Sequence, residues 1–231
     1  VRSQSVAQKF RQDFLVEGRY LYLLQGLGNT LVITLFAIII SFFLGSLIAI
    51  VRTTHDRTGR YIVLNALCKF YLVIIRGTPT MVQLLIIYYV IFAAADVSKV
   101  LVAIVAFGIN SSAYLAEVVR SGIMSIDRGQ SEAGRSLGLS YSQTMRLIIL
   151  PQAFKNVLPA IGNELITLLK ETSISGYIGL VDLTKGSDII RSITYDAMLP
   201  LGVVALIYLA IVLSLSSAVG TLEKKLRKNE R

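Results

Sequence analysis

The apolar residues of this chain are gathered into long blocks separated by short polar stretches. The blocks cover about 30–51, 61–95, 100–119, 151–169 and 198–219. Most are close to the roughly 20 residues that an α-helix needs to cross a bilayer. A soluble protein would rarely place so many such blocks in 231 residues, of which 54% are hydrophobic. The sequence therefore predicts an all-α membrane protein with about five transmembrane helices in one domain.

The second block, 61–95, is too long for one simple span and is interrupted by Arg76, Gly77, Thr78 and Pro79. Proline breaks or kinks a helix because it lacks a backbone N–H and its ring clashes with the preceding turn. We therefore expect a sharp bend at Pro79. A charged residue at this depth is costly unless it faces a cavity, carbonyl groups or the membrane interface, so Arg76 needs such a partner.

The basic residues indicate which side of the membrane each loop faces. Five spans place the two termini on opposite sides. Lys and Arg number 13 on the side that holds loop 52–60, loop 120–155 and the C-terminal tail, against 8 on the other. The side richer in basic residues is expected to be cytoplasmic. This predicts an external arm at 1–20, a transmembrane domain at 21–222 and a cytoplasmic charged tail at 223–231. The arm has the pattern of an amphipathic helix on the membrane surface, or of an exposed tail.

The composition excludes several classes of site and partner. A single cysteine, Cys68, rules out a disulfide framework within the chain and a cysteine-based metal cluster. It lies in an apolar stretch and is expected to be a small buried hydrophobe. No metal site is predicted. The net charge of +9 could suggest nucleic acid, but in a membrane protein it reflects loop placement, so we expect no nucleic-acid partner.

A polar stretch between the third and fourth blocks runs from Glu132 to Pro151 and reads EAGRSLGLSYSQTMRLIILP. Glu132 is expected in the first turn of a helix, where the helix dipole favours a carboxylate. Gly138 can end that helix with a positive φ. Pro151 is then expected to start the next helix, where its missing N–H costs little. The pattern predicts a short helix within the loop 120–150.

Two enzyme motifs are formally present in this stretch. Residues 129–136 read G-x-x-x-x-G-R-S, but Arg135 replaces the lysine of a phosphate-binding loop and no strand precedes it. Residues 134–138 match a nucleophile elbow around Ser136, and the only histidine that could assist is His55. Both matches are explained more simply if these glycines and serines are the small residues of a helix that packs closely against another protein. A membrane serine hydrolase that uses Ser136 and His55 remains a remote alternative.

The loop resembles the cytoplasmic EAA loop of ABC importer permease subunits, and most closely those of the polar amino acid uptake family. The resemblance covers about residues 20–225. It is supported by shorter matches in the order Arg76–Pro79 with Gln83, Ala113–Glu117, Leu150–Ala153, Leu158–Ala160 with Asn163, and Leu169–Ser173. Gly134 departs from the pattern, which usually has a second alanine there. Glycine weakens a helix by about 1 kcal/mol relative to alanine.

The resemblance implies a transport subunit, not an enzyme, in a bacterial cytoplasmic membrane. It implies that the loop forms a coupling helix on a cytoplasmic ATPase, with Glu132, Ala133, Gly134, Ser136 and Gly138 as coupling residues. Its further implied partners are a second permease subunit, in a homo- or heterodimer, an ATPase dimer that binds ATP and Mg²⁺, and an external amino-acid-binding protein. No cofactor is expected in this chain. A passive channel is another alternative, but it would leave the loop unexplained.

Glu164, inside the fourth block, is the strongest candidate for substrate selectivity. An ionisable residue at that depth costs about 2.5–3.5 kcal/mol, so a cavity or a partner is expected. A carboxylate facing a cavity could pair with the side chain of arginine, lysine or histidine. Permeases for cationic amino acids resemble this chain in having a glutamate beside an asparagine here. The alternative is structural: Glu164 would pair with Arg76 or Lys170, or bond backbone near Pro79 or Pro159.

Weaker candidates for substrate contact are Asn163, Thr167, Asn110 and Ser111, each of which could equally bond a neighbouring helix. Glu117 is expected to pair with Arg120 three residues on. Residues 170–197 are expected on the outer side as a re-entrant or interfacial segment.

Acidic residues of that outer segment, among them Asp182, Asp188 and Asp196, could meet the binding protein or simply face solvent. The sequence thus predicts an importer for amino acids, with cationic ones favoured. Glutamine, cystine or another polar amino acid is the alternative within that class.

Overall fold

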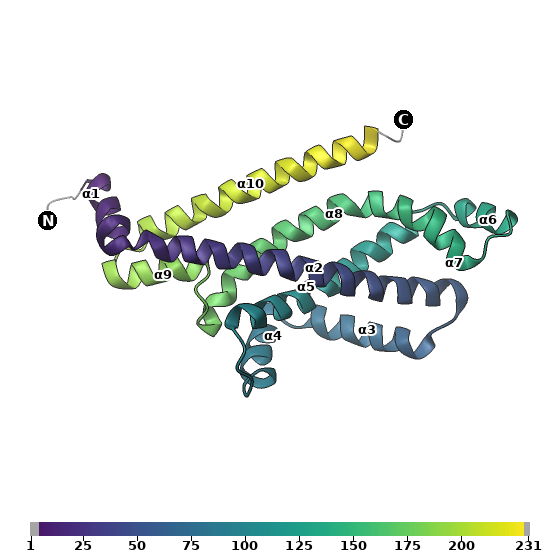
Figure 1. Ribbon diagram of the computed structural model, residues 1–231, viewed down its shortest axis with the longest axis horizontal. Coiled ribbons are helices and arrows are strands. Elements are labelled where there is room, and N and C mark those ends of the chain that lie inside the picture. The colour runs from purple at the N-terminus through teal and green to yellow at the C-terminus, as the bar shows by residue number, and fades with distance from the viewer. Residues whose placement is uncertain (1–4, 229–231) are drawn as a thin grey trace. The chain divides into compact units, whose positions relative to one another are not determined.

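The computed structural model describes residues 5–228, and every regular element within them is helical (Figure 1). The α-helices are α1 (Val6–Phe10), α2 (Tyr20–Thr58), α3 (Ile62–Gly77), α4 (Thr80–Ile86), α5 (Lys99–Met124), α6 (Arg128–Ser136), α7 (Tyr141–Thr144), α8 (Leu150–Glu171), α9 (Leu183–Thr194) and α10 (Met198–Lys228). Short π-helical turns cover Arg11–Leu15, Ile87–Ile91 and Met145–Ile149, and 3-10 turns cover Val16–Gly18 and Thr172–Ile178.

Helices occupy all five predicted spans. Within the described residues, α2, α5 and α10 are each long and apolar enough to cross a membrane. A further span is possible where α3 is followed by the helical segment Thr80–Ile91, which is bent against it by 108°. The break contains Pro79, so the predicted kink is confirmed. The helix α8 has 22 residues, but polar residues such as Glu164 keep it out of this apolar class.

The chain forms two compact units, to which α2, α5, α8 and α10 each contribute residues. Unit 1 consists of Val1–Ala37, Thr80–Phe107 and Ile166–Leu215, and unit 2 consists of Ile38–Pro79, Gly108–Leu165 and Ser216–Arg231. The parts of these units described by the structure are treated one at a time below. The last residues of the predicted tail, 229–231, and the first of the predicted arm, 1–4, lie outside the described residues.

Unit 2 has two apolar clusters. The first joins α2, α5 and α8 to the segment before α8, through Ala49, Val119, Ile123, Ile126, Met145, Ile149, Ala153 and Val157. The second joins α2, α3 and α5 through Ile48, Cys68, Leu72, Ala113 and Ala116. Figure 1 shows α3 beside the later part of α2, in agreement with this cluster. Cys68 is buried there, as predicted.

Unit 1 is built around the packing of α2 on the segment that leads into α9. The Asn29 amide donates to the Val181 carbonyl at 2.8 Å, and the Leu183 N–H donates to the Thr30 hydroxyl at 3.2 Å. Phe14 of the N-terminal arm is 2% exposed and packs with Leu23, Leu183, Ile190 and Val204. The described part of the arm is helical, and Phe14 docks one face of it on the protein.

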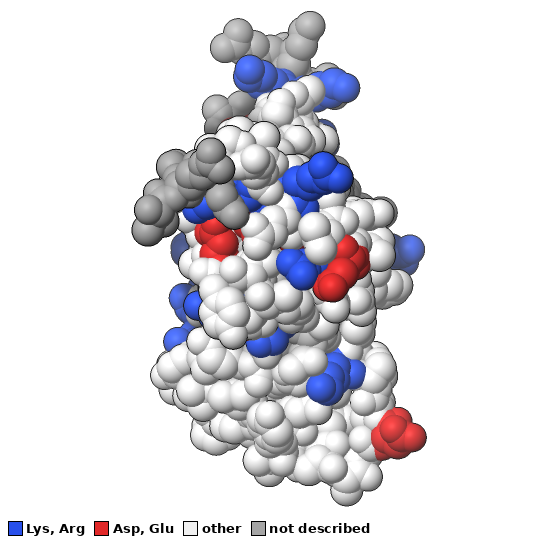
Figure 2. Space-filling view, turned by 90° about the vertical axis from the view of Figure 1, so that its left-hand side faces the viewer, with Lys and Arg blue, Asp and Glu red and all other residues white. Residues whose placement is uncertain are grey.

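The structure corrects the prediction for Asp182, which was expected on a surface open to a partner. Its side chain is fully buried and caps α9, where its carboxylate accepts from the N–H groups of Thr184 and Lys185. Burial raises the pKa of this carboxyl group above its ordinary value. Asp188 is more accessible but is held between Lys185 and Arg191. Figure 2 views the molecule from the α1 and α9 end, where acidic groups near the centre of the face lie beside basic ones.

Close helix contacts in unit 2 depend on glycine. A Cβ atom on Gly122 of α5 would lie 2.0 Å from the Val157 Cγ2 of α8. Valine is stiff at χ1 and cannot easily turn away. We expect Gly122→Ala to destabilise the protein by about 1–3 kcal/mol, the usual range for an overpacked core. The midpoint of thermal unfolding in detergent should fall by several degrees.

Gly220→Ala is the matched control for this prediction, because a Cβ there meets nothing within 4 Å. It should leave the midpoint unchanged. Adding Val157→Ala to Gly122→Ala removes the colliding methyl group and should recover part of the loss. An unchanged midpoint in Gly122→Ala alone would contradict the close α5–α8 contact.

Candidate functional site

Glu164 projects from α8 and is half-buried within unit 2. Its Oε1 accepts a hydrogen bond of 2.8 Å from the Ser111 hydroxyl of α5. Ser111 is 1% exposed, so the bond is shielded from solvent. One hydroxyl donor satisfies only part of a carboxylate, which can accept up to about four hydrogen bonds. The arrangement fixes the orientation of Glu164 and leaves acceptor capacity on it.

Arg76, one of the structural partners considered for Glu164, lies elsewhere in unit 2. Its guanidinium lies 3.9 Å from the Glu117 carboxylate and 5.7 Å from the centre of the Tyr114 ring. A carboxylate and an aromatic face both stabilise a cation within an apolar block. This supports a structural role for Arg76.

Glu117 is the centre of an ionic cluster in unit 2. The predicted pair with Arg120 is present at 4.0 Å, but Arg52 of α2 makes a closer contact with the same carboxylate. Arg120 in turn lies 3.0 Å from Asp56. The contacts of Arg52 and Asp56 were not predicted, because residues about 65 positions apart leave no local spacing signal in the sequence.

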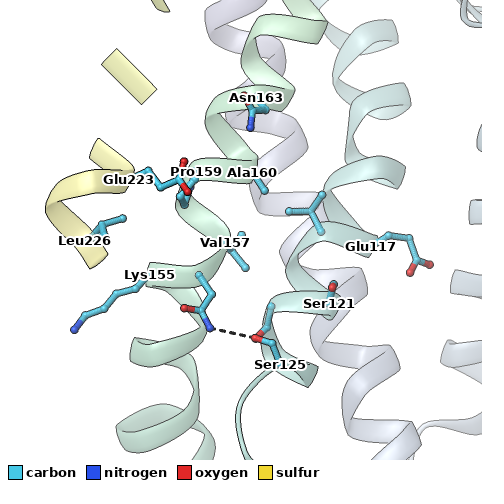
Figure 3. Close-up of a pocket in the computed structure, with 13 residues that line it drawn as sticks. Glu117, Ser121, Ser125, Lys155, Val157, Pro159, Ala160, Asn163, Glu223 and Leu226 are labelled. Carbon is cyan, nitrogen blue, oxygen red and sulfur yellow. Dashed lines mark hydrogen bonds between the residues drawn. The ribbon is translucent and has the colours of Figure 1, made fainter. Parts of the chain in front are cut away.

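Next to α8, unit 2 contains a groove of about 820 Å³ (Figure 3). Its polar lining residues are Glu117, Ser121, Ser125, Lys155, Asn156, Asn163 and Glu223. Binding sites for small molecules are commonly clefts of about 300–1,000 Å³. Of the predicted substrate residues, this groove includes Asn163. The Asn156 amide of α8 donates across it to the Ser125 hydroxyl, which follows the last residue of α5, at 3.1 Å.

The remaining predicted substrate residues are placed differently. Asn110 is 1% exposed and lies within the packing of unit 2. Asn163 and Thr167 are both exposed on α8, although Thr167 belongs to unit 1. Ser121, Ser125 and Asn156 were missed by the sequence analysis. Their small polar side chains at helical spacing resemble ordinary helix-packing residues.

The predicted coupling helix is α6. In Figure 1 it lies beside α7, near the end of unit 2 where α8 begins. The predicted position of Glu132 is wrong: the helix begins at Arg128, and the Asp127 side chain caps it by accepting from the Gly129 N–H at 2.6 Å. Glu132 therefore lies mid-helix, beyond the first turn. The capping aspartate starts the helix one turn earlier than the glutamate suggested.

The end of α6 agrees with the prediction. Gly138 has φ of +79°, a left-handed conformation in which glycine carries no Cβ penalty. The N–H groups of Gly138 and Leu139 donate to the carbonyls of Arg135 and Gly134 at 2.9 and 3.0 Å. These bonds satisfy carbonyls that the end of a helix would otherwise leave unpaired.

The predicted coupling residues differ in exposure. Glu132, Ala133 and Ser136 are exposed on α6, whereas Gly134 is buried against α7. A Cβ on Gly134 would lie 2.8 Å from Cγ2 and 2.9 Å from Oγ1 of Thr144. An alanine at position 134, which the EAA pattern usually has, would therefore collide with Thr144, and this explains why glycine is present there.

The helix α8 begins at Leu150, one residue before Pro151, close to the predicted start. The chain does not enter it from a loop, however, because Met145–Ile149 already forms a π-helical turn that continues from α7. A π turn widens the helix at this point, next to a proline that cannot donate a backbone hydrogen bond.

Neither enzyme motif has the structure that its chemistry requires. Residues 129–136 lie within α6, and no strand is present in the part of the chain that the structure covers. The Ser136 hydroxyl donates to the Glu132 carbonyl at 3.0 Å. The His55 Nδ1 lies 2.9 Å from the Arg60 carbonyl. Both side chains are thus engaged locally with backbone.

Comparison with known proteins identifies the family. Residues 41–228 match the model for the binding-protein-dependent transport system inner membrane component. The arginine transport system permease protein ArtQ of Bacillus subtilis (strain 168) is 38% identical over 90% of this chain and 94% of its own. A protein of Rickettsia typhi (strain ATCC VR-144 / Wilmington) named for glutamine transport, GlnP, is 35% identical over 91% and 95%.

Solved structures agree. One similar chain comes from a structure described as a crystal structure of an amino acid ABC transporter with histidines. It is 39% identical and superimposes with a TM-score of 0.82, and the match covers 92% of this chain and 98% of that chain. A chain of the MetNI methionine ABC transporter, in an inward-facing form, gives a TM-score of 0.76 at 22% identity over 89% and 96%, which shows a shared fold.

In this family ATP hydrolysis is carried out by a separate chain, so the protein is a transport component and not an enzyme. The chain belongs to the family of binding-protein-dependent transport system inner membrane components, and it is an amino acid ABC importer permease subunit.

Proposed function

We propose that this permease carries cationic amino acids, such as arginine, lysine and histidine, into the cytoplasm. The observation that carries the proposal is the Glu164 carboxylate, half-buried in α8 and held by the Ser111 hydroxyl at 2.8 Å. A carboxylate in a membrane-spanning region is retained where it has a partner or a function. Ser111 is a neutral donor, and no Lys or Arg of the described residues forms an ion pair with Glu164, so a substrate cation can take that place.

The relatives support this assignment. ArtQ is named for arginine transport, and the similar crystal structure is described as containing histidines. Both amino acids carry a side chain that can be positively charged. In our proposal the side chain of the amino acid pairs with Glu164, and Asn163 of the same unit contacts its polar groups. Asn110 and Ser111 support the site from the protein side.

Glutamine is the second candidate, because GlnP is also similar over nearly the whole chain. A carboxylate that already accepts from Ser111 could accept from a neutral amide as well. In that case Glu164 would act as a hydrogen-bond acceptor and its charge would not set the selectivity.

Transport requires partners, which we assign from the family. Two permease subunits, identical or different, would form the pathway, with the N-terminus outside and the C-terminus in the cytoplasm. The exposed residues of α6 would dock on an ATPase dimer, and an external binding protein would deliver the amino acid. Closure of the ATPases on ATP would move α6, and the spans would then open the pathway to the outside.

The substrate class is tested by uptake into vesicles that contain the permease, its ATPase and its binding protein. We expect arginine, lysine and histidine to compete with one another, and glutamine to compete poorly at equal concentration. Uptake should require ATP on the side of the vesicle membrane that carries α6 and the ATPases. Glutamine uptake that excess arginine does not reduce would contradict the cationic assignment and favour the second candidate.

The coupling role of α6 gives a separate prediction. Glu132→Ala removes an exposed carboxylate from the proposed docking surface and should weaken ATPase association about tenfold, the effect of about 1.4 kcal/mol. Gly138→Val should do the same by straining the left-handed end of the helix. Association is measured by co-purification and by titration of the ATPase. Normal assembly and normal transport in both variants would exclude this role.

Asp96→Asn is the control for the lost charge, since this exposed acidic residue lies in unit 1, outside the coupling helix. It should leave ATPase association unchanged.

A further inference from the structure

The segment of α5 that carries Ser111 is held by hydroxyl groups from two neighbouring helices of unit 2. The Ser41 hydroxyl of α2 donates to the Gly108 carbonyl at 3.0 Å. The Tyr71 hydroxyl of α3 lies 2.6 Å from the Ile109 carbonyl. Both carbonyls belong to the turn of α5 that leads directly to Ser111. The two contacts therefore lie next to the residue that orients the carboxylate of the candidate site.

Tyr71 and Ser112 form a closed group of hydrogen bonds with the Ile109 carbonyl. The two hydroxyl oxygens are 2.6 Å apart, and the Ser112 hydroxyl lies 2.8 Å from the same carbonyl. Each hydroxyl has one proton, so one of them donates to the carbonyl and the other donates to its neighbouring hydroxyl. In both arrangements the Tyr71 oxygen is bonded to α5. Ser112 is fully buried and Tyr71 is half-buried, so water competes little for these bonds.

Ser111 and Ser112 are consecutive in α5 but face different helices. Successive residues of an α-helix point about 100° apart around its axis. Ser112 meets Tyr71 of α3. Ser111 meets Glu164 of α8, at 2.8 Å. The rotation of α5 about its axis therefore sets both contacts, and a turn that breaks the first one also points the Ser111 hydroxyl away from Glu164.

On its other side, this part of α5 packs closely against the backbone of α2. A Cβ atom on Gly45 of α2 would lie 2.8 Å from the carbonyl oxygen of Ser112 and 3.0 Å from the backbone nitrogen of Ala116. Such a contact prevents α5 from moving toward α2, but a helix held along one line can still turn about that line. The hydrogen bond from Tyr71, which reaches α5 from α3, removes this freedom.

We propose that Tyr71 is a positioning residue of the amino acid site: its hydroxyl fixes the rotation of α5 and so aims the Ser111 hydroxyl at the Glu164 carboxylate. This inference rests on the proposed function, in which Glu164 meets the amino acid. Tyr71 does not touch the amino acid and acts only through Ser111. Its ring packs against the apolar cluster that joins α2, α3 and α5, so the ring and the hydroxyl have separate roles.

Tyr71→Phe tests the hydroxyl alone, because it keeps the ring and leaves the Ser112 hydroxyl as a donor to the Ile109 carbonyl. Binding of arginine and of glutamine is measured by isothermal titration calorimetry on the intact complex of the permease and its ATPases. The binding protein is left out, since its own affinity would mask the change. We expect the Kd of arginine to rise about three- to tenfold, the effect of one neutral hydrogen bond, and by no more than in Ser111→Ala. ATP hydrolysis by the same complex should stay unchanged.

Two further variants separate positioning from a general structural role. In Ser111→Ala the hydroxyl that Tyr71 would aim is gone, so adding Tyr71→Phe should cause no further loss of affinity. Residues that act through one contact give non-additive effects, whereas independent structural effects add. Tyr61→Phe is the matched control, because it removes the hydroxyl of an exposed tyrosine directly before α3. It should leave the affinity for arginine unchanged.

Unchanged affinity in Tyr71→Phe would overturn the positioning role, as would losses that multiply in the double variant or a parallel loss of ATP hydrolysis. The proposed function is judged separately, on the native complex. If that complex binds glutamine more tightly than arginine, the cationic assignment is contradicted, and the same variants measured with glutamine still decide the role of Tyr71. If it prefers arginine and Tyr71→Phe binds arginine normally, the proposed function stands and only the positioning role is lost.

Discussion

Glu164→Gln is expected to reduce arginine uptake about 30- to 100-fold, because a hydrogen bond to a charged group contributes about 2–3 kcal/mol. Glutamine keeps the size of the side chain and an oxygen that can accept from Ser111. The variant therefore removes the charge with little change in packing. The measurement is the initial rate of uptake of arginine, lysine and glutamine into reconstituted vesicles.

Glutamine uptake is the internal control for this prediction, since a folded and coupled variant should carry the neutral substrate as before. Ser111→Ala provides a graded test. It removes the donor that orients Glu164 but keeps its charge, so arginine uptake should fall about three- to tenfold, equivalent to roughly 1 kcal/mol. Equal losses for arginine and glutamine in Glu164→Gln would show that Glu164 is structural.

Gly134→Ala is expected to uncouple ATP hydrolysis from transport, with at least a tenfold fall in the amino acid carried per ATP. Alanine favours a helix over glycine by about 1 kcal/mol, so propensity alone would make this change stabilising. The new Cβ, however, would lie 2.8 Å from Thr144 Cγ2 and 3.2 Å from Ile148 Cδ1. Overpacking of this kind costs about 1–3 kcal/mol, and a β-branched threonine cannot rotate away easily.

The clash should outweigh the gain in helix propensity and displace α6 from α7. ATPase activity and uptake are measured on the same vesicles, so that their ratio reports the coupling. Gly134→Ala combined with Thr144→Ala is the matched control, because the second change removes Thr144 Cγ2 and Oγ1, the two atoms nearest to the new Cβ. It should restore the ratio to within about threefold of the native value, while an uncorrected ratio would show that α6 fails for another reason.

Local features of the sequence predicted several of the helix ends and bends that position the candidate site. The bend at Pro79 follows from the geometry of proline, and the left-handed Gly138 follows from its position after a helical pattern. The predicted start of α6 is wrong, because it places Glu132 in the first turn of the helix. The Asp127 cap, which lies outside the EAA pattern, starts the helix at Arg128.

The contacts around the functional residues could not be predicted in the same way. The Ser111 hydroxyl meets Glu164 across 53 positions, and Arg52 meets Glu117 across 65. Such pairs depend on which helix faces pack together, and periodicity gives no information about that choice. For the same reason the sequence placed Asp182 on an open surface, whereas the structure buries it as the cap of α9.

The sequence by itself determined the class of the protein: apolar blocks of bilayer length, a polar loop with the EAA pattern and a carboxylate in the fourth block are local properties of the chain. Only the tertiary structure decided what each polar group contacts. It gave Glu164 a neutral partner, placed Arg76 beside Glu117, and set Gly134 against Thr144. The physical reason is that burial of a polar or charged group is tolerated only with a partner, and packing alone selects that partner.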